Sequence, residues 1–587
     1  MAAKKWVLGV FLSFLLAAFT VNLIIQDLQE VPSHLGELNG LDGKRNQLVY
    51  ISTAIERLKN MVHGLVGGSW SCNGESLKPD QILLSPNLST CHESMGKPGF
   101  PVYCCPPKRE SEEPFIEFQF PNASSPLRVR RPAHLVDDEY IAKYKKALSI
   151  MKSLPFDDPR SFMRQADMHC IYCTGAYNQQ HSNSLLNIHR SWLFFPWHRM
   201  MIYFHERILG NLIGDDTFAL PFWNWDSPPG MVMPNMYMKL PFLDENRQNS
   251  HLPPHLADIN FDYVESGLGP EEQIATNLAF MYNQMVSGAK KSELFMGCPY
   301  KAGENGSCNG PGTIELAPHN SLHTWVGSPL NIYRENMGVF YAAARDPIFY
   351  AHHSNIDRLW EVWRGLRGYK PEIIDPLWLD SYFFFHDENK QLVRVRIRDV
   401  LDIAKLGYSY EHVDHLWLNA RPKPSVAPEI ARSILNMRGD HNGKSADFGP
   451  KGRTLDAIIR ARVLRPKRQR SKKEREEEEV LVVYGIDVKR DMFVKFDVYV
   501  NAVDETTLSP KAREFAGTFV NVRRGVTIVM NEGDAVMKRK SNLKLGISEL
   551  LEDLEANEDE TIWVSLVPRG GTGVNTTFDG IRIEFMA

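Results

Sequence analysis

The chain carries little net charge for its length. Its 587 residues include 67 lysines and arginines and 71 aspartates and glutamates, which leaves a formal net charge of −4. Proteins that hold nucleic acid through its phosphates have a clear basic excess, so this balance excludes a general nucleic-acid-binding role. The length is sufficient for a large core and at least one further domain.

Cysteine is also scarce, with eight residues in the whole chain. An even number favours disulfide bonds if the chain matures in an oxidising compartment. Cys298 and Cys308 bracket a glycine-rich loop and are candidates for one such bond, whereas Cys72 has no evident partner.

One long uncharged stretch stands near the N-terminus. Residues 6–25 form an uncharged run of 20 behind Lys4 and Lys5. About 20 apolar residues can span a bilayer, so we interpret residues 1–30 as a secretory signal peptide or a signal anchor. The two lysines favour a cytosolic N-terminus, with the rest of the chain in the lumen. Residues 31–90 are interpreted as a polar stem or N-terminal arm, and a membrane is contacted only through residues 6–25 if they are not cleaved.

Closely spaced histidines are the main chemical signal. His319 and His323 stand four apart, so on a helix both imidazoles project from one face and can reach one ion. The downstream pair His352-His353 supplies a third nitrogen. This half-site alone is a weak signal, because two histidines at this spacing also occur by chance on helix surfaces.

A second set of histidines lies upstream. His169 stands in Met-His-Cys-Ile-Tyr-Cys, and His189 and His198 enclose Arg-Ser-Trp-Leu-Phe-Phe-Pro-Trp. Two sets of three imply two metal ions. Neutral imidazole suits copper, zinc, iron and nickel, and three nitrogens leave a coordination position open for chemistry. A structural dizinc protein fits poorly, because closed tetrahedral zinc sites usually include cysteine.

These motifs resemble those of the plant polyphenol oxidases, which are type 3 copper catechol oxidases and tyrosinases. The resemblance runs from about Cys91 to the C-terminus, through His-Cys-x-Tyr-Cys, His-x-Ser-Trp-Leu-Phe-Phe-Pro-x-His-Arg, Pro-His-Asn and Asp-Pro-Ile-Phe-Tyr-x-His-His. It implies two copper ions, one held by His169, His189 and His198 and the other by His319, His323 and His353. The implied reaction oxidises small o-diphenols to o-quinones while O2 is reduced to water. A reversible O2 carrier like the haemocyanins, which share the dicopper centre, is the alternative.

The resemblance also implies covalent links around the first histidine set. Cys91 would pair with Cys105, and Cys104 with Cys170. Cys173 would be bonded through its sulfur to the imidazole carbon of His189, which would limit the motion of that ligand. An ordinary buried thiol or half-cystine is the alternative for Cys173.

Three further residues match positions that the family uses at the site. Glu315 and Asn320 would hold a water that takes the proton of a monophenol, since a phenol with a pKa near 10 must reach copper as phenolate. Phe340 would be the gate above the second copper. The alternatives are that Glu315 only holds a loop and that Phe340 only packs in the core.

The fold class implied by the resemblance is a mainly α catalytic domain over residues 91–422, in which a four-helix bundle holds the two copper ions. We expect one buried helix to begin near Pro196 and another to cover residues 347–366. On the latter, Asp357 follows His353 by one turn and either orients that ligand or forms an ion pair with Arg358 or another basic group. His205 has no matching copper position and is expected to be a packed or surface histidine.

The C-terminal part reads as a separate domain. Residues 423–454 are rich in Pro, Gly, Asn and Asp, which indicates an exposed linker open to an activating protease. Short β-type runs at 480–486, 493–500 and 561–566 then predict a small antiparallel sandwich over residues 455–587. In the family this domain covers the copper site and keeps the enzyme latent until it is displaced.

The predicted compartment differs from the one usual for the family. Its members generally begin with a serine-rich plastid transit peptide, whereas residues 6–25 argue for the secretory pathway. We therefore predict the ER, Golgi, vacuole or apoplast, and rank the thylakoid lumen second. Four sequons, at Asn87, Asn122, Asn305 and Asn575, would allow N-glycosylation there.

Overall fold

The computed structural model describes residues 83–586, apart from short internal stretches. Those stretches are 98–99, 108–113, 123, 304–305, 307, 332–334, 370–372, 438–445, 450, 467–476, 489–491, 524–525 and 528–539. The described residues fall in one compact unit, Leu77–Ala587. The predicted signal segment 1–30, nearly all of the stem, and Cys72 lie outside them. Among the described residues, no helix is long and apolar enough to cross a bilayer.

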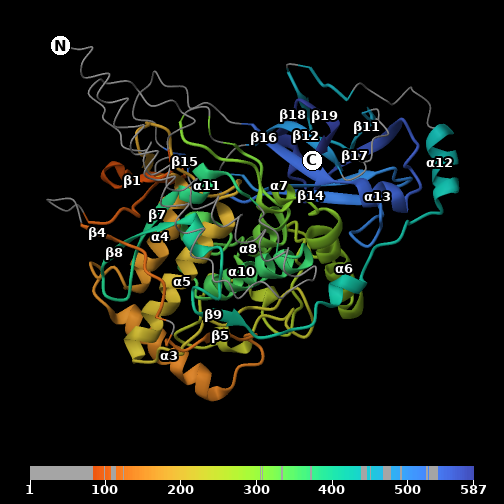
Figure 1. The fold of residues 1–587 in the computed structure, drawn as a ribbon. Coiled ribbons are helices and arrows are strands. Elements are labelled where there is room, and N and C mark those ends of the chain that lie inside the picture. The colour runs from red at the N-terminus through yellow and green to blue at the C-terminus, as the bar shows by residue number, and fades with distance from the viewer. Residues whose placement is uncertain are drawn as a thin grey trace, which may run out of the picture. The chain divides into compact units, whose positions relative to one another are not determined.

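The first part of the described chain is built mainly from helices (Figure 1). Their bounds are α3 Asp138–Ser153, α4 Phe162–Thr174, α5 Phe194–Ile213, α6 Pro270–Tyr282, α7 Ser292–Met296, α8 Asn320–Val326, α9 Phe340–Ala343, α10 Ile348–Leu366 and α11 Pro376–Asp380. The helix expected near Pro196 begins at Phe194, which places the proline in the first turn, where its missing N–H costs little. The helix expected over residues 347–366 is α10.

Helices α5 and α10 form the centre of this region. Most side chains of both helices are buried on every side, as expected for helices inside a core rather than on its surface. Helix α5 ends at Gly214, whose positive φ of 68° suits glycine at this cap. The pair therefore provides a fixed, solvent-free frame for the histidines they carry.

Short strands connect distant parts of the helical region. They are β1 Pro86–Asn87, β2 Ser94–Lys97, β3 Phe100–Val102, β4 Phe115–Glu117, β5 Arg128–Arg130, β6 Asn178–Gln179, β7 Tyr382–His386, β8 Leu392–Arg396 and β9 Tyr408–Tyr410. Strand β5 pairs in parallel with β9, which is the Tyr-x-Tyr motif, so both ends of the helical region meet there.

The C-terminal part consists mainly of β-strands, drawn in blue in Figure 1. They are β10 Arg453–Thr454, β11 Ile459–Leu464, β12 Glu478–Val488, β13 Val494–Val500, β14 Phe515–Asn521, β15 Val526–Thr527, β16 Ser541–Gly546, β17 Thr561–Arg569, β18 Thr576–Phe578 and β19 Gly580–Met586, with one helix, α13 Ser548–Asp553. One antiparallel sheet has the order β11-β17-β13-β14, and a second contains β10, β18, β12, β16 and β19. Apolar side chains of both sheets share one buried core. The prediction of a helical region followed by a β-rich region is thus confirmed.

The segment predicted as an exposed linker is partly packed. Helix α12, Pro428–Met437, lies within it, and its Ala431 and Leu435 are buried. These two residues are four apart and share one helix face, and Ile430 and Ile434 extend the same apolar spacing, so the helix has a local signal that the overall composition of residues 423–454 does not show. Upstream, the N–H of Arg513 donates to the carbonyl of Lys423 at 2.9 Å, so the segment is held against the β-rich region.

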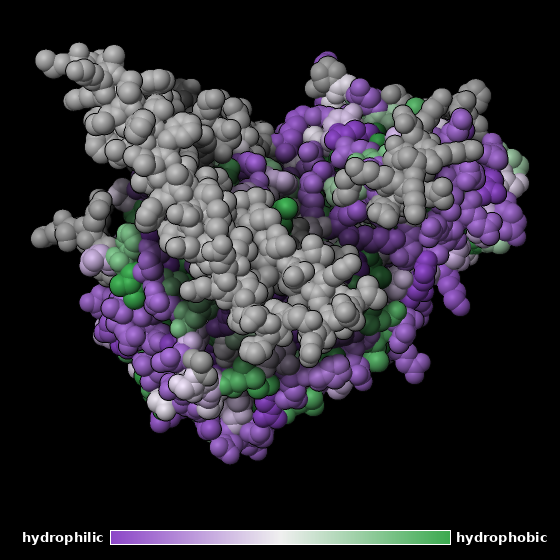
Figure 2. Space-filling model, in the orientation of Figure 1, coloured by the Kyte–Doolittle hydropathy of each residue, from purple (hydrophilic) through white to green (hydrophobic). Residues whose placement is uncertain are grey.

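The described surface on the face drawn in Figure 2 is mostly hydrophilic.

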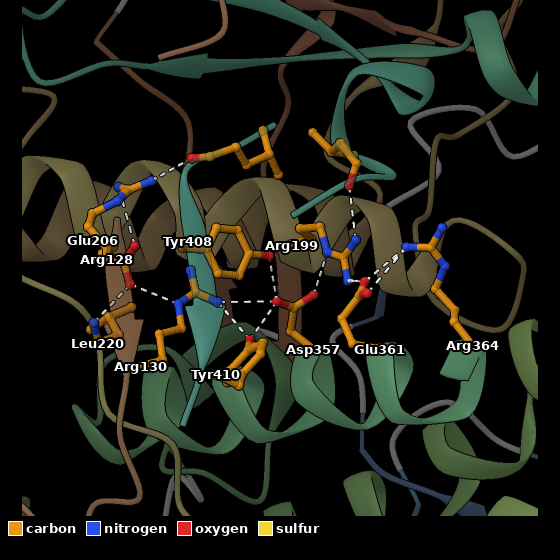
Figure 3. Close-up of polar contacts among 12 residues, drawn as sticks. Arg128, Arg130, Arg199, Glu206, Leu220, Asp357, Glu361, Arg364, Tyr408 and Tyr410 are labelled. Carbon is orange, nitrogen blue, oxygen red and sulfur yellow. Dashed lines mark hydrogen bonds and ion pairs between the residues drawn. The ribbon is translucent and has the colours of Figure 1, made fainter. Parts of the chain in front are cut away.

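A buried carboxylate joins the central helices to the paired strands (Figure 3). Asp357 on α10 accepts hydrogen bonds from Arg199 of α5 at 2.5 Å and from Arg130 of β5 at 3.1 Å. The hydroxyls of Tyr408 and Tyr410 in β9 donate to the same carboxylate at 2.7 and 2.5 Å. Burial alone would raise the pKa of Asp357, but the two arginines hold that pKa below its usual value.

The same two arginines bind further carboxylates. Arg130 also donates to Glu206 at 2.8 Å, and Arg199 to Glu361 at 2.6 Å. Of the two sequence-based interpretations of Asp357, these contacts correspond to the ion pair, with Arg199 and Arg130 as partners. Arg358 instead binds Asp226 at 2.5 Å.

Asp357→Ala should strongly destabilise the chain. The substitution leaves two buried guanidinium groups short of an anion, and breaking a buried pair costs about 3–5 kcal/mol. The free energy of unfolding measured in denaturant reports this loss. Asp380→Ala is the matched control, because its partner Arg398 is solvent-exposed and such pairs contribute only about 0–1 kcal/mol. Equal effects of the two substitutions would contradict this account of the network.

Candidate metal centre

Three buried histidines form the first group. His169 comes from α4, His189 from the loop after it, and His198 from the first turns of α5. One ring nitrogen from each lies within 4.8 Å of the others, close enough for a single ion. The structure thus brings together the three residues predicted from the upstream motif.

Four buried histidines form the second group. His319 ends a short π-helical turn, Glu315–His319, His323 lies on α8, and His352 and His353 are consecutive on α10. The Nε2 atoms of His319 and His323 are 3.1 Å apart, as their spacing of four predicts. Both members of the His352-His353 pair remain within reach of this group.

The two groups are direct neighbours. The rings of His198 and His353 stack with centroids 4.3 Å apart, and those of His189 and His319 are 6.1 Å apart. His352 lies on the other side of the second group, with its ring 5.9 Å from that of Trp225. The arrangement can therefore hold two ions side by side.

Backbone carbonyls fix the orientation of several rings. The Nδ1 atoms of His169, His198 and His323 lie 3.0, 2.7 and 2.9 Å from the carbonyl oxygens of Phe340, Phe194 and Met337, respectively. A carbonyl only accepts, so in each ring the proton must be on Nδ1 and the lone pair on Nε2.

The unpaired nitrogens fit a metal. Nε2 of His198 and both ring nitrogens of His353 are buried and have no hydrogen-bond partner among the described residues. Burial lowers the pKa of His198 to about 3 and that of His323 to about 4, and it holds the pKa of His353 well below its usual value. All three rings are therefore neutral at ordinary pH, the form that binds a metal.

The cysteines lie around the first group. Disulfides join Cys91 to Cys105, Cys104 to Cys170 and Cys298 to Cys308, and the first two are the pairs implied by the family resemblance. Cys173 lies outside these bonds and is buried. Its sulfur is 3.4 Å from Nδ1 of His189 and 3.1 Å from Nε2 of His169, so it touches the ring to which the resemblance links it.

Glu315, Asn320 and Phe340, the other residues predicted for the site, lie beside the histidine groups. Glu315 Oε1 accepts a hydrogen bond from the backbone N–H of Arg190 at 2.6 Å. Asn320 has its Oδ1 atom 3.0 Å from Nδ1 of His319. The ring of Phe340 stacks on His189 at 4.6 Å and lies 6.2 Å from that of His319, so it faces both groups. His205 stacks on Tyr350 at 3.6 Å and belongs to neither group.

Strand β14 of the C-terminal region reaches the site. The family resemblance implied that this region covers the site, but the sequence did not reveal which strand makes the contact. The side-chain amide of Asn320 donates to the backbone carbonyl of Val520 at 3.2 Å. Nearby, Val339 pairs with Arg523, and the N–H of Phe340 donates to the carbonyl of Arg523 at 3.4 Å. In each pair the two partners lie about two hundred residues apart in the chain. A local sequence pattern does not predict contacts over such a separation.

Comparison with known proteins agrees with this geometry. Family models described as the common central domain of tyrosinase, the polyphenol oxidase middle domain and the chloroplastic polyphenol oxidase C-terminal domain match residues 159–366, 372–423 and 451–585. The aureusidin synthase of Antirrhinum majus is 47% identical over 514 residues, 86% of this chain and 88% of that relative. The chloroplastic polyphenol oxidase of Malus domestica is 44% identical over 544 residues, 90% of this chain and 89% of that relative. The solved structure of latent apple tyrosinase has 45% identity and a TM-score of 0.73, and the match covers 81% of this chain and 100% of that one.

The chain belongs to the plant polyphenol oxidases, the tyrosinase-type enzymes whose cofactor is a dicopper centre. It is a copper-dependent enzyme that oxidises phenols, and the two histidine groups are where copper could bind. The O2-carrier alternative is not favoured, because the relatives are oxidases.

The predicted secretory location is wrong. Relatives from four plants, matched over most of their length, are named as chloroplastic, which points to the plastid. The prediction depended on an apolar run in residues 6–25, and hydropathy alone does not distinguish the membranes to which such a run is directed.

Acid should remove copper only together with the fold. The folded-state pKa values of His198 and His323 lie below the ordinary 6.5, so the free energy of unfolding falls as the pH drops below about 6.5, and copper loss should accompany unfolding rather than precede it. Copper per chain after gel filtration and tryptophan fluorescence, measured at the same pH values, report the two events. Loss of copper near pH 6.5 from a chain that is still folded would contradict this description.

Proposed function

We propose that this enzyme oxidises o-diphenols to o-quinones with O2 as the oxidant. Two diphenols lose four electrons and four protons, and one O2 takes them up as two waters. The observation that carries the proposal is the pair of buried, adjacent groups of neutral imidazoles. Bound copper would supply the redox chemistry, accepting electrons from the diphenol and delivering them to O2.

Each ion would have three histidine ligands. His169, His189 and His198 would hold one, and His319, His323 and His353 the other. We assign His353 rather than His352 because its ring also stacks on His198 of the first group. Helices α4, α5, α8 and α10, which carry four of these ligands, would form the four-helix bundle. A sulfur–carbon bond between Cys173 and His189 would hold that ring in place, and the contact of 3.4 Å supports it.

Hydroxylation of monophenols is the second proposed activity. The phenol proton needs an acceptor, because the hydroxyl has a pKa near 10. Glu315 and Asn320 would hold the water that takes it, since both side chains lie beside His319 or the loop of His189. Phe340 would guide the ring of the substrate, as its stacking against both groups suggests.

We also propose that the intact chain is latent. The carbonyl of Val520 in β14 accepts a hydrogen bond from the side-chain amide of Asn320, and Arg523 pairs with Val339, which precedes Phe340. Residues 455–587 would thus shield a catalytic domain of residues 91–422. A protease that cuts within residues 423–454 would release residues 455–587 and thereby open the catalytic domain. A relative has been solved in a form named latent.

Oxygen uptake with catechol tests this function. Copper-loaded intact chain should consume O2 slowly, and the rate should rise after a cut within residues 438–445. His353→Ala should retain one copper per chain instead of two and lose the uptake, whereas His352→Ala should retain both. The reverse result would assign the ligand to His352. Absence of uptake from cut chain that contains two copper ions would contradict the proposed reaction.

Glu315→Gln should separate the two activities. The amide cannot activate the water, and loss of a positioned base typically costs about 100-fold or more in rate. Tyramine hydroxylation by the cut chain should therefore fall far more than catechol oxidation. Glu293→Gln is the matched control, because that carboxylate pairs with Lys544 away from the histidines. Equal losses with both substrates would leave Glu315 a purely structural role.

A further inference from the structure

The side chain of Arg190 meets the same strand that covers the site. Its guanidinium donates a hydrogen bond to Oδ1 of Asn521 in β14 and lies 5.5 Å from the ring centroid of Phe519. It also donates to Oδ1 of Asn309 at 3.4 Å. The residue is only 7% exposed, so this cation is almost entirely enclosed.

The backbone of Arg190 is tied to the metal centre. Arg190 follows His189 directly, and its N–H holds Glu315 at 2.6 Å. Its φ of 62° lies in the left-handed region, which ordinary side chains rarely adopt, so neighbouring contacts must hold it there. The backbone that carries the guanidinium is thereby anchored at the edge of the histidine groups.

Two partners of this cation belong to the region that must move. If residues 455–587 are displaced, Asn521 and Phe519 leave together, while Asn309 stays with the helical part. A guanidinium that loses an acceptor and an aromatic neighbour at the edge of a phenol site is suited to a ligand that supplies both. A carboxylate accepts two parallel hydrogen bonds from a guanidinium, which makes it a stronger acceptor than an amide oxygen.

We infer that Arg190 is a substrate-binding residue of the opened enzyme and selects phenols with a carboxylate on the side chain. In the intact chain, Asn521 accepts the hydrogen bond that the carboxylate of the substrate would accept, and Phe519 lies where an aromatic ring would contact Arg190. The inference rests on the proposed function, because it requires that β14 withdraws. A role only as a latch makes a different prediction, since loss of the cation would then activate the intact chain without altering substrate preference.

Kinetics with matched acids and esters test the inference. The substrates are 3,4-dihydroxybenzoate, 3,4-dihydroxyphenylacetate and 3,4-dihydroxyphenylpropionate, each with its methyl ester, and catechol as the reference. The enzyme is the full copper-loaded chain cut within residues 438–445. We expect at least one acid to exceed its ester in kcat/KM by about tenfold, mainly through KM, the size of a charge-assisted hydrogen bond.

Variants at Arg190 locate the effect. Arg190→Gln should bring the acid-to-ester ratio close to one, and Arg190→Lys should restore part of the preference. The ratio is the readout, because it compares two substrates on the same variant and does not depend on the rate with catechol. Lys511→Gln is the matched control, because it removes the same charge from an exposed pair with Glu272. An acid-to-ester ratio that is the same in wild type and Arg190→Gln would overturn the inference.

Binding of a redox-inert ligand decides the matter independently of turnover. Titration calorimetry should show that 3-phenylpropionate binds the cut chain more tightly than 3-phenylpropionamide, and that Arg190→Gln removes this difference. If catechol is not oxidised, the proposed function fails, yet this measurement still tests Arg190. Equal binding of acid and amide by the wild-type chain would contradict the inference.

Discussion

The ion pair between Asp357 and two arginines is the interaction on which the metal centre depends. It fixes α10 to α5 through Arg199 and both helices to β5 through Arg130. His198 and His353 are carried by those same two helices, and their rings stack with centroids 4.3 Å apart, so the ion pair joins the two elements that bring the histidine groups together. A fully buried network of charges is costly to assemble, but once every partner is present it tolerates little displacement.

Burial has a second consequence at the histidines. It lowers the pKa values of six of the seven rings, those of His169, His198, His319, His323, His352 and His353, so these six can lie together without mutual charge repulsion. The carbonyls that accept from Nδ1 then direct Nε2 lone pairs inward. Around this neutral centre, Glu315 and Arg190 supply the nearby charges, joined by one backbone hydrogen bond. Mostly neutral imidazole rings thus surround the place where metal would bind, and Glu315 and Arg190 lie at its edge.

Much of the site could be predicted from the sequence because its signals are local. The spacing of His319 and His323, the two histidine sets and the resemblance around Cys173 each lie within a short segment. The helical region was implied by the same resemblance, and the β-rich region was predicted from short β-type runs separated by turn signals. The partners of Asp357, the reach of Val520 to Asn320 and the contact of Arg190 with Asn521 could not be predicted, because they join segments far apart in the chain.

Two errors have separate physical causes. Helix α12 was missed because the prediction relied on the overall composition of residues 423–454, although Ile430, Ala431, Ile434 and Leu435 have the spacing of one apolar helix face. The location was misjudged because an apolar run reports affinity for a membrane and not its identity.

The measurement that tests the account most directly is the anomalous scattering of copper in crystals of the intact, copper-loaded chain. The account predicts two neighbouring peaks, one among His169, His189 and His198 and the other among His319, His323 and His353, with β14 still bonded to Asn320. A single peak, or copper bound outside these two groups, would contradict it.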